Sequence, residues 1–260
     1  MILVSGQSHS VINNRNALIL SQIEAHAKNK EAYSLIAKVV NVGVALLVYG
    51  RDAGVARRTC DVQTAWTGCG PAFMGNKGAV GIRFRVTDVD GGIGETYTYG
   101  LPFFRFITMP EIKNYDFRFV NCHLTAFDYR LQQRIADYKH IVGTLLFPPV
   151  FTESSTPSTL YETSHLFIFG DLNFRVALPE SHPLYVKQKT PEFSQAIESE
   201  KSREELKEFD QLTTEKKKGS IFIGLREGDF WKFKCSYKYK LGEVDKYRCV
   251  LADWIGCCCN

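Results

Sequence analysis

The chain has 260 residues, 45% of them hydrophobic and 23% charged, so it can bury a sizeable core. Wholly disordered, collagen-like and disulfide-dense proteins are thereby excluded. Lys and Arg number 32 against 28 Asp and Glu, a net charge of +4. This excess permits anionic partners, but it is too small to indicate a nucleic-acid-binding protein.

The cysteines predict a reducing compartment. Four are isolated, none belongs to a C-x-x-C pair, and the other four, Cys249 and Cys257 to Cys259, lie near the C-terminus. Isolated cysteines without a signal peptide favour free thiols. The longest apolar run, 35–49, is too short for a membrane span. We therefore expect a soluble, cytoplasmic chain.

Apolar periodicity and turn residues predict the elements in chain order. An amphipathic helix is expected over 15–30, followed by strands over 33–40, 43–49, 61–66 and 79–86, with turn-rich segments over 68–78 and 88–94. The second half predicts a strand over 117–122, a helix over 131–145, a strand over 166–169, a charged helical segment over 192–218, and strands over 221–223 and 231–239. Interleaved strands and helices without an internal repeat indicate one α/β domain.

Polar side chains follow two of these strands and a glycine-rich loop. His123 ends the first strand, Asp171 and Asn173 follow the second, and Asn76 and Lys77 lie in the loop. Each has an ordinary explanation alone, because histidines after strands, Asp-Asn turns and exposed loop lysines are common. Together they suit phosphate chemistry: a carboxylate can orient water, while His, Asn and Lys can bind phosphoryl oxygens.

The apolar residues that alternate with Asp171 and Asn173 add a geometric expectation. In an extended backbone, alternation with Leu172 and Phe174 makes the carboxylate and the amide point the same way. Near the C-terminus, lysines alternate with aromatic residues over 231–240. A strand there would have either an ordinary solvated lysine face or a basic surface for a multiply phosphorylated ligand or an anionic bilayer.

Five segments occur in the order and rough spacing of the inositol polyphosphate 5-phosphatases, which this chain resembles. They are GNKGAVGIRF (75–84), FVNCHLTA (119–126), FIFGDLNFRV (167–176), FDQL (209–212) and REGDFWKFKCSYKYK (226–240). The resemblance implies an α/β fold, the four-layered α/β sandwich of the endonuclease/exonuclease/phosphatase type, incomplete here. It also implies a single partial catalytic domain over 1–260, truncated at both ends, with an atypical tail over 248–260.

The resemblance also implies a role for each matching residue. His123 would contact the scissile phosphate, Asp171 would orient the attacking water, and Asn173 would bind the scissile phosphate. The substrate-binding residues would be Asn76 and Lys77 at the 1-phosphate side, and Tyr237 and Lys238 at the 4-phosphate. The implied reaction is hydrolysis of the 5-phosphate of a phosphoinositide lipid or a soluble inositol polyphosphate, with Mg²⁺ as cofactor, peripheral membrane contact and no nucleic-acid partner.

Two family motifs do not occur in this sequence: the Gln-Glu that supplies the principal metal ligand and a C-terminal Asp–His pair. The metal ligands are therefore unknown, and we expect a poorly active or inactive chain. Two alternatives stay open. One is a non-catalytic phosphoinositide-binding protein, and the other is a magnesium-dependent nuclease of the same fold.

Overall fold

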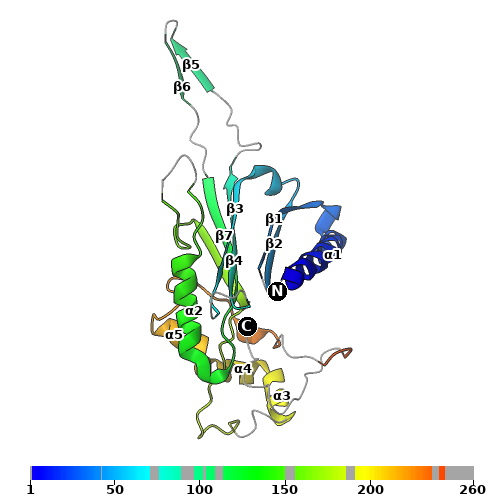
Figure 1. Cartoon of the computed structure of the whole chain (residues 1–260), viewed down its shortest axis with the longest axis vertical. Helices are drawn as coiled ribbons and strands as arrows, with labels where there is room; N and C mark the ends of the chain where they lie inside the picture. The colour runs from blue at the N-terminus through cyan, green and yellow to red at the C-terminus, as the bar shows by residue number, and fades with distance from the viewer. Residues whose placement is uncertain are drawn as a thin grey trace. The chain divides into compact units, whose positions relative to one another are not determined.

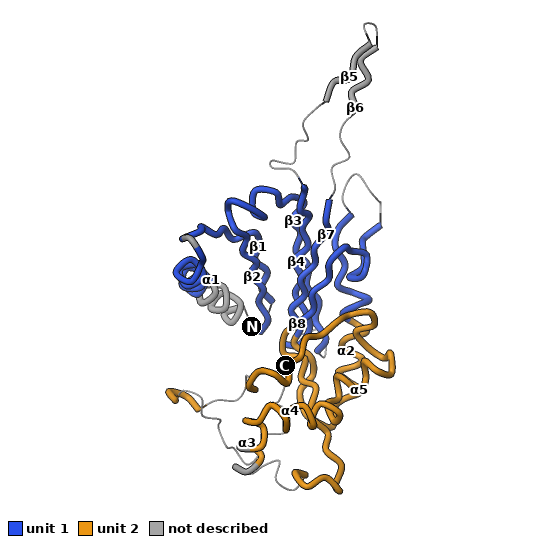
Figure 2. The backbone as a smooth tube through the Cα atoms, turned by 180° about the vertical axis from the view of Figure 1, so that it is seen from behind, with its two compact units in different colours: residues 1–122, 141–169 blue, residues 123–140, 170–260 orange. Residues whose placement is uncertain are grey.

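The structure is a computed structural model that describes residues 2–41, 43–70, 76–88, 97–101, 104–108, 114–149, 156–185, 191–235 and 240–243. It divides into two compact units (Figure 2). Unit 1 comprises Met1–Cys122 and Ile141–Phe169, and unit 2 comprises His123–His140 and Gly170–Asn260. The single catalytic domain over 1–260 stays a prediction, and the tail over 248–260 lies outside the described residues.

The described strands form three sheets (Figure 1). An antiparallel pair contains β1 (Tyr33–Asn41) and β2 (Val44–Arg51), and a four-stranded sheet has the order β3 (Thr59–Gly68), β4 (Gly78–Thr87), β7 (Asn114–His123), β8 (His165–Asp171). A third, antiparallel pair contains β5 (Tyr97–Leu101) and β6 (Phe104–Thr108). The strands predicted over 33–40, 43–49, 61–66, 79–86, 117–122 and 166–169 are all confirmed.

The core of unit 1 lies between the β1–β2 pair and β4. Every residue of β4 is buried, because its apolar run is covered on both faces. Its side chains Val80, Ile82, Phe84 and Val86 pack against Val39, Val44 and Leu46 of the β1–β2 pair. This face-to-face packing explains why the strand reads as a nearly continuous apolar run in the sequence.

The helix α1 (Ile2–His26) lies against the β1–β2 pair on the side away from β4 (Figure 1). Lys38 donates to Asn13 Oδ1 at 2.6 Å, and Tyr49 donates to Asn16 Oδ1 at 2.5 Å. The predicted helix is confirmed, although it begins at Ile2, ends earlier than predicted and is followed by a 3-10 turn at Lys28–Lys30. Its predicted apolar stripe is partly wrong, because Leu18 is 61% and Ile19 39% exposed.

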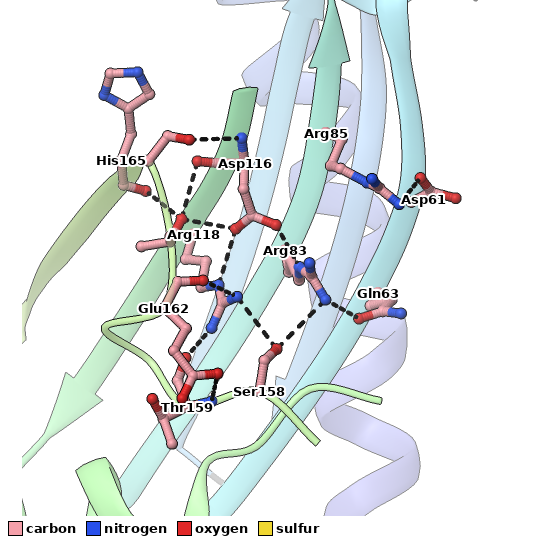
Figure 3. Close-up of polar contacts among 12 residues, drawn as sticks. Asp61, Gln63, Arg83, Arg85, Asp116, Arg118, Ser158, Thr159, Glu162 and His165 are labelled. Carbon is pink, nitrogen blue, oxygen red and sulfur yellow. Dashed lines mark hydrogen bonds and ion pairs between the residues drawn. The ribbon is translucent and has the colours of Figure 1, made fainter. Parts of the chain in front are cut away.

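A buried charge cluster fastens a loop to the four-stranded sheet of unit 1 (Figure 3). Asp116 accepts from Arg83 Nε at 2.6 Å and from Arg118 Nε at 2.9 Å. Arg118 is fully buried and also donates to the carbonyl oxygens of Thr159 and Glu162. The loop that contains these two carbonyls is thereby held by a charge on β7.

The longer regular elements described in unit 2 are helices, joined by turns and irregular segments. They are α2 (Leu131–Thr144, whose last residues belong to unit 1), α3 (Pro191–Glu198), α4 (Glu200–Leu206) and α5 (Gln211–Lys217). Short 3-10 helices span Asp128–Arg130, Lys207–Phe209 and Phe230–Lys232, with one more, Ala56–Arg58, in unit 1. The core joins the residues Leu178, Phe193, Ile197, Leu206 and Cys235.

The helical segment predicted over 192–218 is confirmed, but capping residues divide it. Ser199 accepts from the backbone N–H of Ser202 and begins α4, and Asp210 accepts from that of Thr213 at 2.7 Å and begins α5. Such side chains satisfy the first N–H groups of a helix and so set its start.

Two predicted strands are wrong where the structure describes them. Residues 221–223 turn between Gly219 and Gly224, which both have positive φ angles, and Phe222 packs on Tyr138 with ring centroids 4.3 Å apart. Residues 230–232 form a 3-10 helix, and the carbonyl of Trp231 accepts from Arg203 Nε at 2.7 Å instead of pairing with a neighbouring strand. The segments 236–239 and 89–94 lie outside the described residues. None of the described helices is long and apolar enough to cross a membrane.

Candidate active site

Two strand ends bring His123 and Asp171 together. His123 is the last residue of β7 and Asp171 the last of β8, and the backbone N–H of Leu124 donates to the carbonyl of Asp171 at 3.0 Å. The imidazole Nε2 lies 3.5 Å from the carboxylate Oδ2. The Asp171 carboxylate is 59% exposed and the His123 side chain 29%. An accessible carboxylate beside an imidazole can orient a water and donate to an anionic oxygen.

Asn173 has a different environment from Asp171. Its backbone is left-handed, with φ at +57°, and its side chain is buried. The amide Nδ2 donates to the carbonyl of Leu124 at 3.0 Å, and Oδ1 accepts from Arg175 Nη2 at 2.7 Å. Asparagine tolerates this backbone region better than most residues. The expected common direction of the Asp171 and Asn173 side chains is therefore wrong, because the backbone is not extended at Asn173.

Sequence reasoning missed Arg134 and Gln211. Arg134 of α2 donates to the carbonyl of Thr125 at 3.2 Å and to Gln211 Oε1 at 2.7 Å. Gln211 Oε1 also accepts from the backbone N–H of Arg175 at 3.1 Å. A signal was present, because Arg134 interrupts the apolar stripe of α2 and Gln211 lies in the FDQL segment.

Asn76 and Lys77 belong to unit 1, in the turn before β4, where Asn76 is exposed and Lys77 half-buried. The backbone N–H of Cys69 donates to the carbonyl of Lys77 at 2.8 Å. Gly78 has φ at +145°, and a Cβ there would lie 2.1 Å from the carbonyl oxygen of Thr67. Only glycine therefore fits the end of this turn, while the substrate-binding role of Asn76 and Lys77 stays a prediction.

The predicted pair Tyr237 and Lys238 lies outside the described residues. Three lysines of the same stretch that are described each face a carboxylate. Lys232 Nζ lies 2.7 Å from Asp229, Lys234 Nζ lies 3.7 Å from Glu198, and Lys240 Nζ lies 3.9 Å from Glu243. These contacts match the ordinary solvated lysine surface, one of the two interpretations of this stretch.

The described residues do not by themselves form a metal site. Among them, no group of three or more His, Cys, Asp or Glu side chains is arranged to hold an ion. His123 and Asp171 supply two potential ligands, whereas Mg²⁺ takes an octahedral set of oxygen ligands, several of them water.

Comparison with known proteins places the chain in a class. Residues 7–97 and 103–250 match the model of Endonuclease/Exonuclease/phosphatase family 2, so the chain belongs to this family. The family match extends over most described residues of both compact units, and the resemblance drawn from the five segments is confirmed.

Particular relatives carry the comparison further. Synaptojanin-2 of Rattus norvegicus is 28% identical over 224 residues, which cover 86% of this chain and 12% of that protein. The type II inositol 1,4,5-trisphosphate 5-phosphatase of Mus musculus is 28% identical over 214 residues, covering 82% of this chain and 18% of that protein. The chain thus spans less than a fifth of either relative.

A solved structure shows the same fold. The inositol polyphosphate 5-phosphatase domain of SPsynaptojanin, in complex with inositol (1,4)-bisphosphate and calcium ion, aligns with a TM-score of 0.59 at 20% identity. The alignment covers 93% of this chain and 58% of that one. The predicted α/β fold of the endonuclease/exonuclease/phosphatase type is therefore confirmed.

Proposed function

We propose that the chain is a 5-phosphatase domain that hydrolyses the 5-phosphate monoester of a phosphoinositide lipid or a soluble inositol polyphosphate. The observation that carries the proposal is the His123–Asp171 pair at two strand ends. Support for the substrate class comes from the relatives, one of which is an inositol 1,4,5-trisphosphate 5-phosphatase. Phosphoryl transfer depends on positioning and charge stabilisation, which such a pair can supply.

In the proposed reaction one water attacks phosphorus, a new P–O bond forms, and the bond between phosphorus and the oxygen on ring carbon 5 breaks. The attacking water releases one proton to solvent, and the departing oxygen takes up one proton from solvent to become the 5-hydroxyl, so the products are the alcohol and inorganic phosphate. The exposed Asp171 carboxylate accepts a hydrogen bond from this water and orients it. His123 donates Nε2–H to a phosphoryl oxygen, an interaction that counts most where negative charge develops. Asn173 keeps the segment after Asp171 in place through Leu124, and its own contact with the scissile phosphate stays a prediction.

Phosphate release tests the proposal. We expect release from vesicles with PI(4,5)P₂ or from soluble inositol 1,4,5-trisphosphate, and a loss of about 100- to 10,000-fold in His123→Ala and Asp171→Asn, because both remove groups of the reaction. His165→Ala is the matched control, since His165 begins β8 and stacks on Phe117 at 4.6 Å. Equal release from the wild type and His123→Ala would contradict the function.

We also propose that this chain has low phosphatase activity, because two motifs of the family do not occur in its sequence. The wild type is expected to release phosphate slowly, yet measurably above His123→Ala. Vesicle binding without any release would favour the non-catalytic alternative. Cleavage of abasic-site DNA without phosphate release would favour the nuclease.

We also propose Mg²⁺ as the cofactor. The fold is generally metal-dependent, and the solved relative is a complex with calcium ion. Because the described residues do not form a metal site, no step above uses the ion. EDTA is expected to lower phosphate release at least about tenfold, and excess Mg²⁺ to restore it. Full activity in EDTA would contradict this part.

Peripheral membrane contact is proposed on a surface next to the His123 segment. Phe127 and Tyr129 are 59% and 75% exposed, and their rings stack with centroids 5.7 Å apart. The guanidinium of Arg130 lies 6.0 Å and 5.7 Å from the two rings. Exposed aromatic rings beside a cation suit the interface of an anionic bilayer. Co-sedimentation with anionic vesicles should weaken in Tyr129→Ser, and an unchanged bound fraction would contradict the contact.

A further inference from the structure

Arg134 is fully buried in unit 2, and its guanidinium carbon lies 5.6 Å from the ring centroid of Phe174. Its nitrogens donate to four oxygens: Thr125 O at 3.2 Å, Phe127 O, Asp128 O at 3.3 Å and Gln211 Oε1 at 2.7 Å. A planar guanidinium can serve several acceptors at once, whereas a lysine ammonium cannot match this fork.

These partners belong to the two segments of the candidate active site. The three carbonyl oxygens lie in the loop that directly follows His123. Phe174 lies in the segment that follows Asp171, and Gln211 Oε1 also accepts the backbone N–H of Arg175 in that segment. Arg134 therefore contacts both segments. It binds the backbone of the loop after His123 directly, and it reaches the segment after Asp171 through the ring of Phe174 and through Gln211.

The buried charge of Arg134 must be compensated by the groups around it. No carboxylate of a described residue lies within ion-pair distance of Arg134, so its direct partners are carbonyl and amide oxygens and the ring of Phe174. The more distant carboxylates of Asp128 and Asp137 favour its charge. Its Nε atom has no hydrogen-bond partner within the part of the chain that the structure describes. Burial, followed by the charge of Arg175, lowers the pKa of Arg134 to about 10, so it stays protonated at neutral pH. A buried cation needs all of these dipoles in place, because an unmet charge is costly.

We infer that Arg134 is a positioning residue, which sets the separation and orientation of His123 and Asp171 by holding both segments. The kinetic part of this inference rests on the proposed 5-phosphatase function. In a reaction that depends on alignment, a displacement of about 1 Å can cost about 100-fold in rate. Arg134 touches neither the proposed water nor the phosphate, so its effect comes through the two other residues.

The first test compares Arg134→Lys with Arg118→Lys. Both arginines are fully buried, and both lie over a phenylalanine ring, Arg118 over Phe147 at 5.4 Å. Arg134→Lys should lower kcat about 10- to 100-fold with KM changed less than about threefold, because binding groups remain. Arg118→Lys should keep kcat per folded molecule, since its bonds hold the loop near Thr159. Equal kcat losses in both variants, or unchanged kcat in Arg134→Lys, would overturn the inference.

Gln211 gives a milder second test with a conservative rescue. Gln211→Glu keeps an oxygen acceptor for both Arg134 and the Arg175 N–H, whereas Gln211→Met has a similar length and removes it. We expect kcat near the wild-type value in Gln211→Glu and a fall of about tenfold in Gln211→Met. If Gln211 had a purely structural role, the activity of both variants would change only in proportion to the fraction of folded protein. That result would overturn the inference.

An NMR measurement separates this inference from the proposed function. The ring signals of His123, assigned by comparison with His123→Ala, should shift in Arg134→Lys and keep their positions in Arg118→Lys. If the wild type releases no phosphate, the proposed function fails, and a shifted His123 signal still supports the positioning role. Unchanged ring signals in Arg134→Lys overturn that role whether or not the wild type is active.

Discussion

Among the described residues, each compact unit has one arginine that is completely buried, and the two charges are compensated differently. In unit 1, Arg118 donates to the carboxylate of Asp116, which also accepts from Arg83 (Figure 3). In unit 2, the described partners of Arg134 are carbonyl oxygens, the amide oxygen of Gln211 and an aromatic ring. An ion pair compensates a charge with a single carboxylate, whereas carbonyl dipoles must act together.

The two arginines therefore have different roles: Arg118 holds a loop against a sheet, whereas Arg134 aligns two segments of the candidate active site. The Arg118 cluster fixes one loop to a sheet. Its carboxylate, Asp116, lies on the same strand as Arg118, so this ion pair should not depend on the position of a distant segment. The Arg134 cluster depends on the backbone course of two segments that are far apart in sequence, each next to a candidate catalytic residue. Variants of the two clusters should therefore affect stability and activity in different proportions.

The largest effect is expected for Asp116→Asn. This change leaves Arg83 and Arg118 buried without their shared carboxylate, so the free energy of unfolding should fall by about 3–5 kcal/mol. Gln211→Met removes the acceptor of Arg134 and of the Arg175 N–H in unit 2 and should cost about 1.5–3 kcal/mol, less than the loss of the carboxylate. Urea unfolding followed by circular dichroism measures both. Equal losses would remove the distinction between the charged and the neutral cluster.

An intermediate effect is expected at the two rings beneath the arginines. Phe147→Leu and Phe174→Leu each remove a cation–π contact and some packing volume, so each should lower the free energy of unfolding by about 1–2 kcal/mol. Only Phe174→Leu should also lower kcat, by about tenfold, because Phe174 belongs to the segment after Asp171. A similar kcat loss in Phe147→Leu would contradict the separation.

The smallest effect concerns the pH dependence of stability through Asp210. This buried carboxylate has no ion pair among the described residues, and burial raises its pKa, although hydrogen bonds from Thr213 partly offset the rise. As pH rises above the ordinary aspartate value, the unfolded chain loses this proton first. The free energy of unfolding should therefore fall as pH rises toward the raised pKa, and then level off.

Asp210→Asn should remove this fall, because the asparagine oxygen can still cap α5 and no charge is buried. Urea unfolding of the variant and the wild type at several acidic pH values measures the difference. A wild-type fall that persists unchanged in Asp210→Asn would assign the pH dependence to another carboxyl group.

The sequence predicted much of the framework because apolar periodicity is local. The strand that became β4 was evident from 79–86, yet its alternate arginines, Arg83 and Arg85, gave no sign that both would be buried. Their burial depends on carboxylates from other strands, Asp116 and Asp61. The local hydrophobic pattern of a strand does not predict ion pairs with residues of other strands.

The candidate site was predicted only in part, because some of its features are local in sequence and others depend on contacts between distant residues. The sequence predicted that His123 and Asp171 each follow a strand, whereas their proximity, with Nε2 3.5 Å from Oδ2, became evident only in the structure. The direction of Asn173 was wrong, because its left-handed backbone is stabilised by a bond to Leu124, which is 49 positions away in the chain. The strand over 221–223 failed similarly, since two glycines and a ring contact with Tyr138 outweigh its β-branched residues.

The separation in sequence between the partners of the site has a consequence for synthesis. Arg134 and Gln211 are 77 positions apart, so the alignment they provide cannot exist until the chain has been made as far as α5. Helix α2 is local and can form early, whereas contacts between distant segments must first overcome loop-closure entropy. A nascent chain that ends before Gln211 would thus carry both His123 and Asp171 while still lacking the bond that aligns their segments.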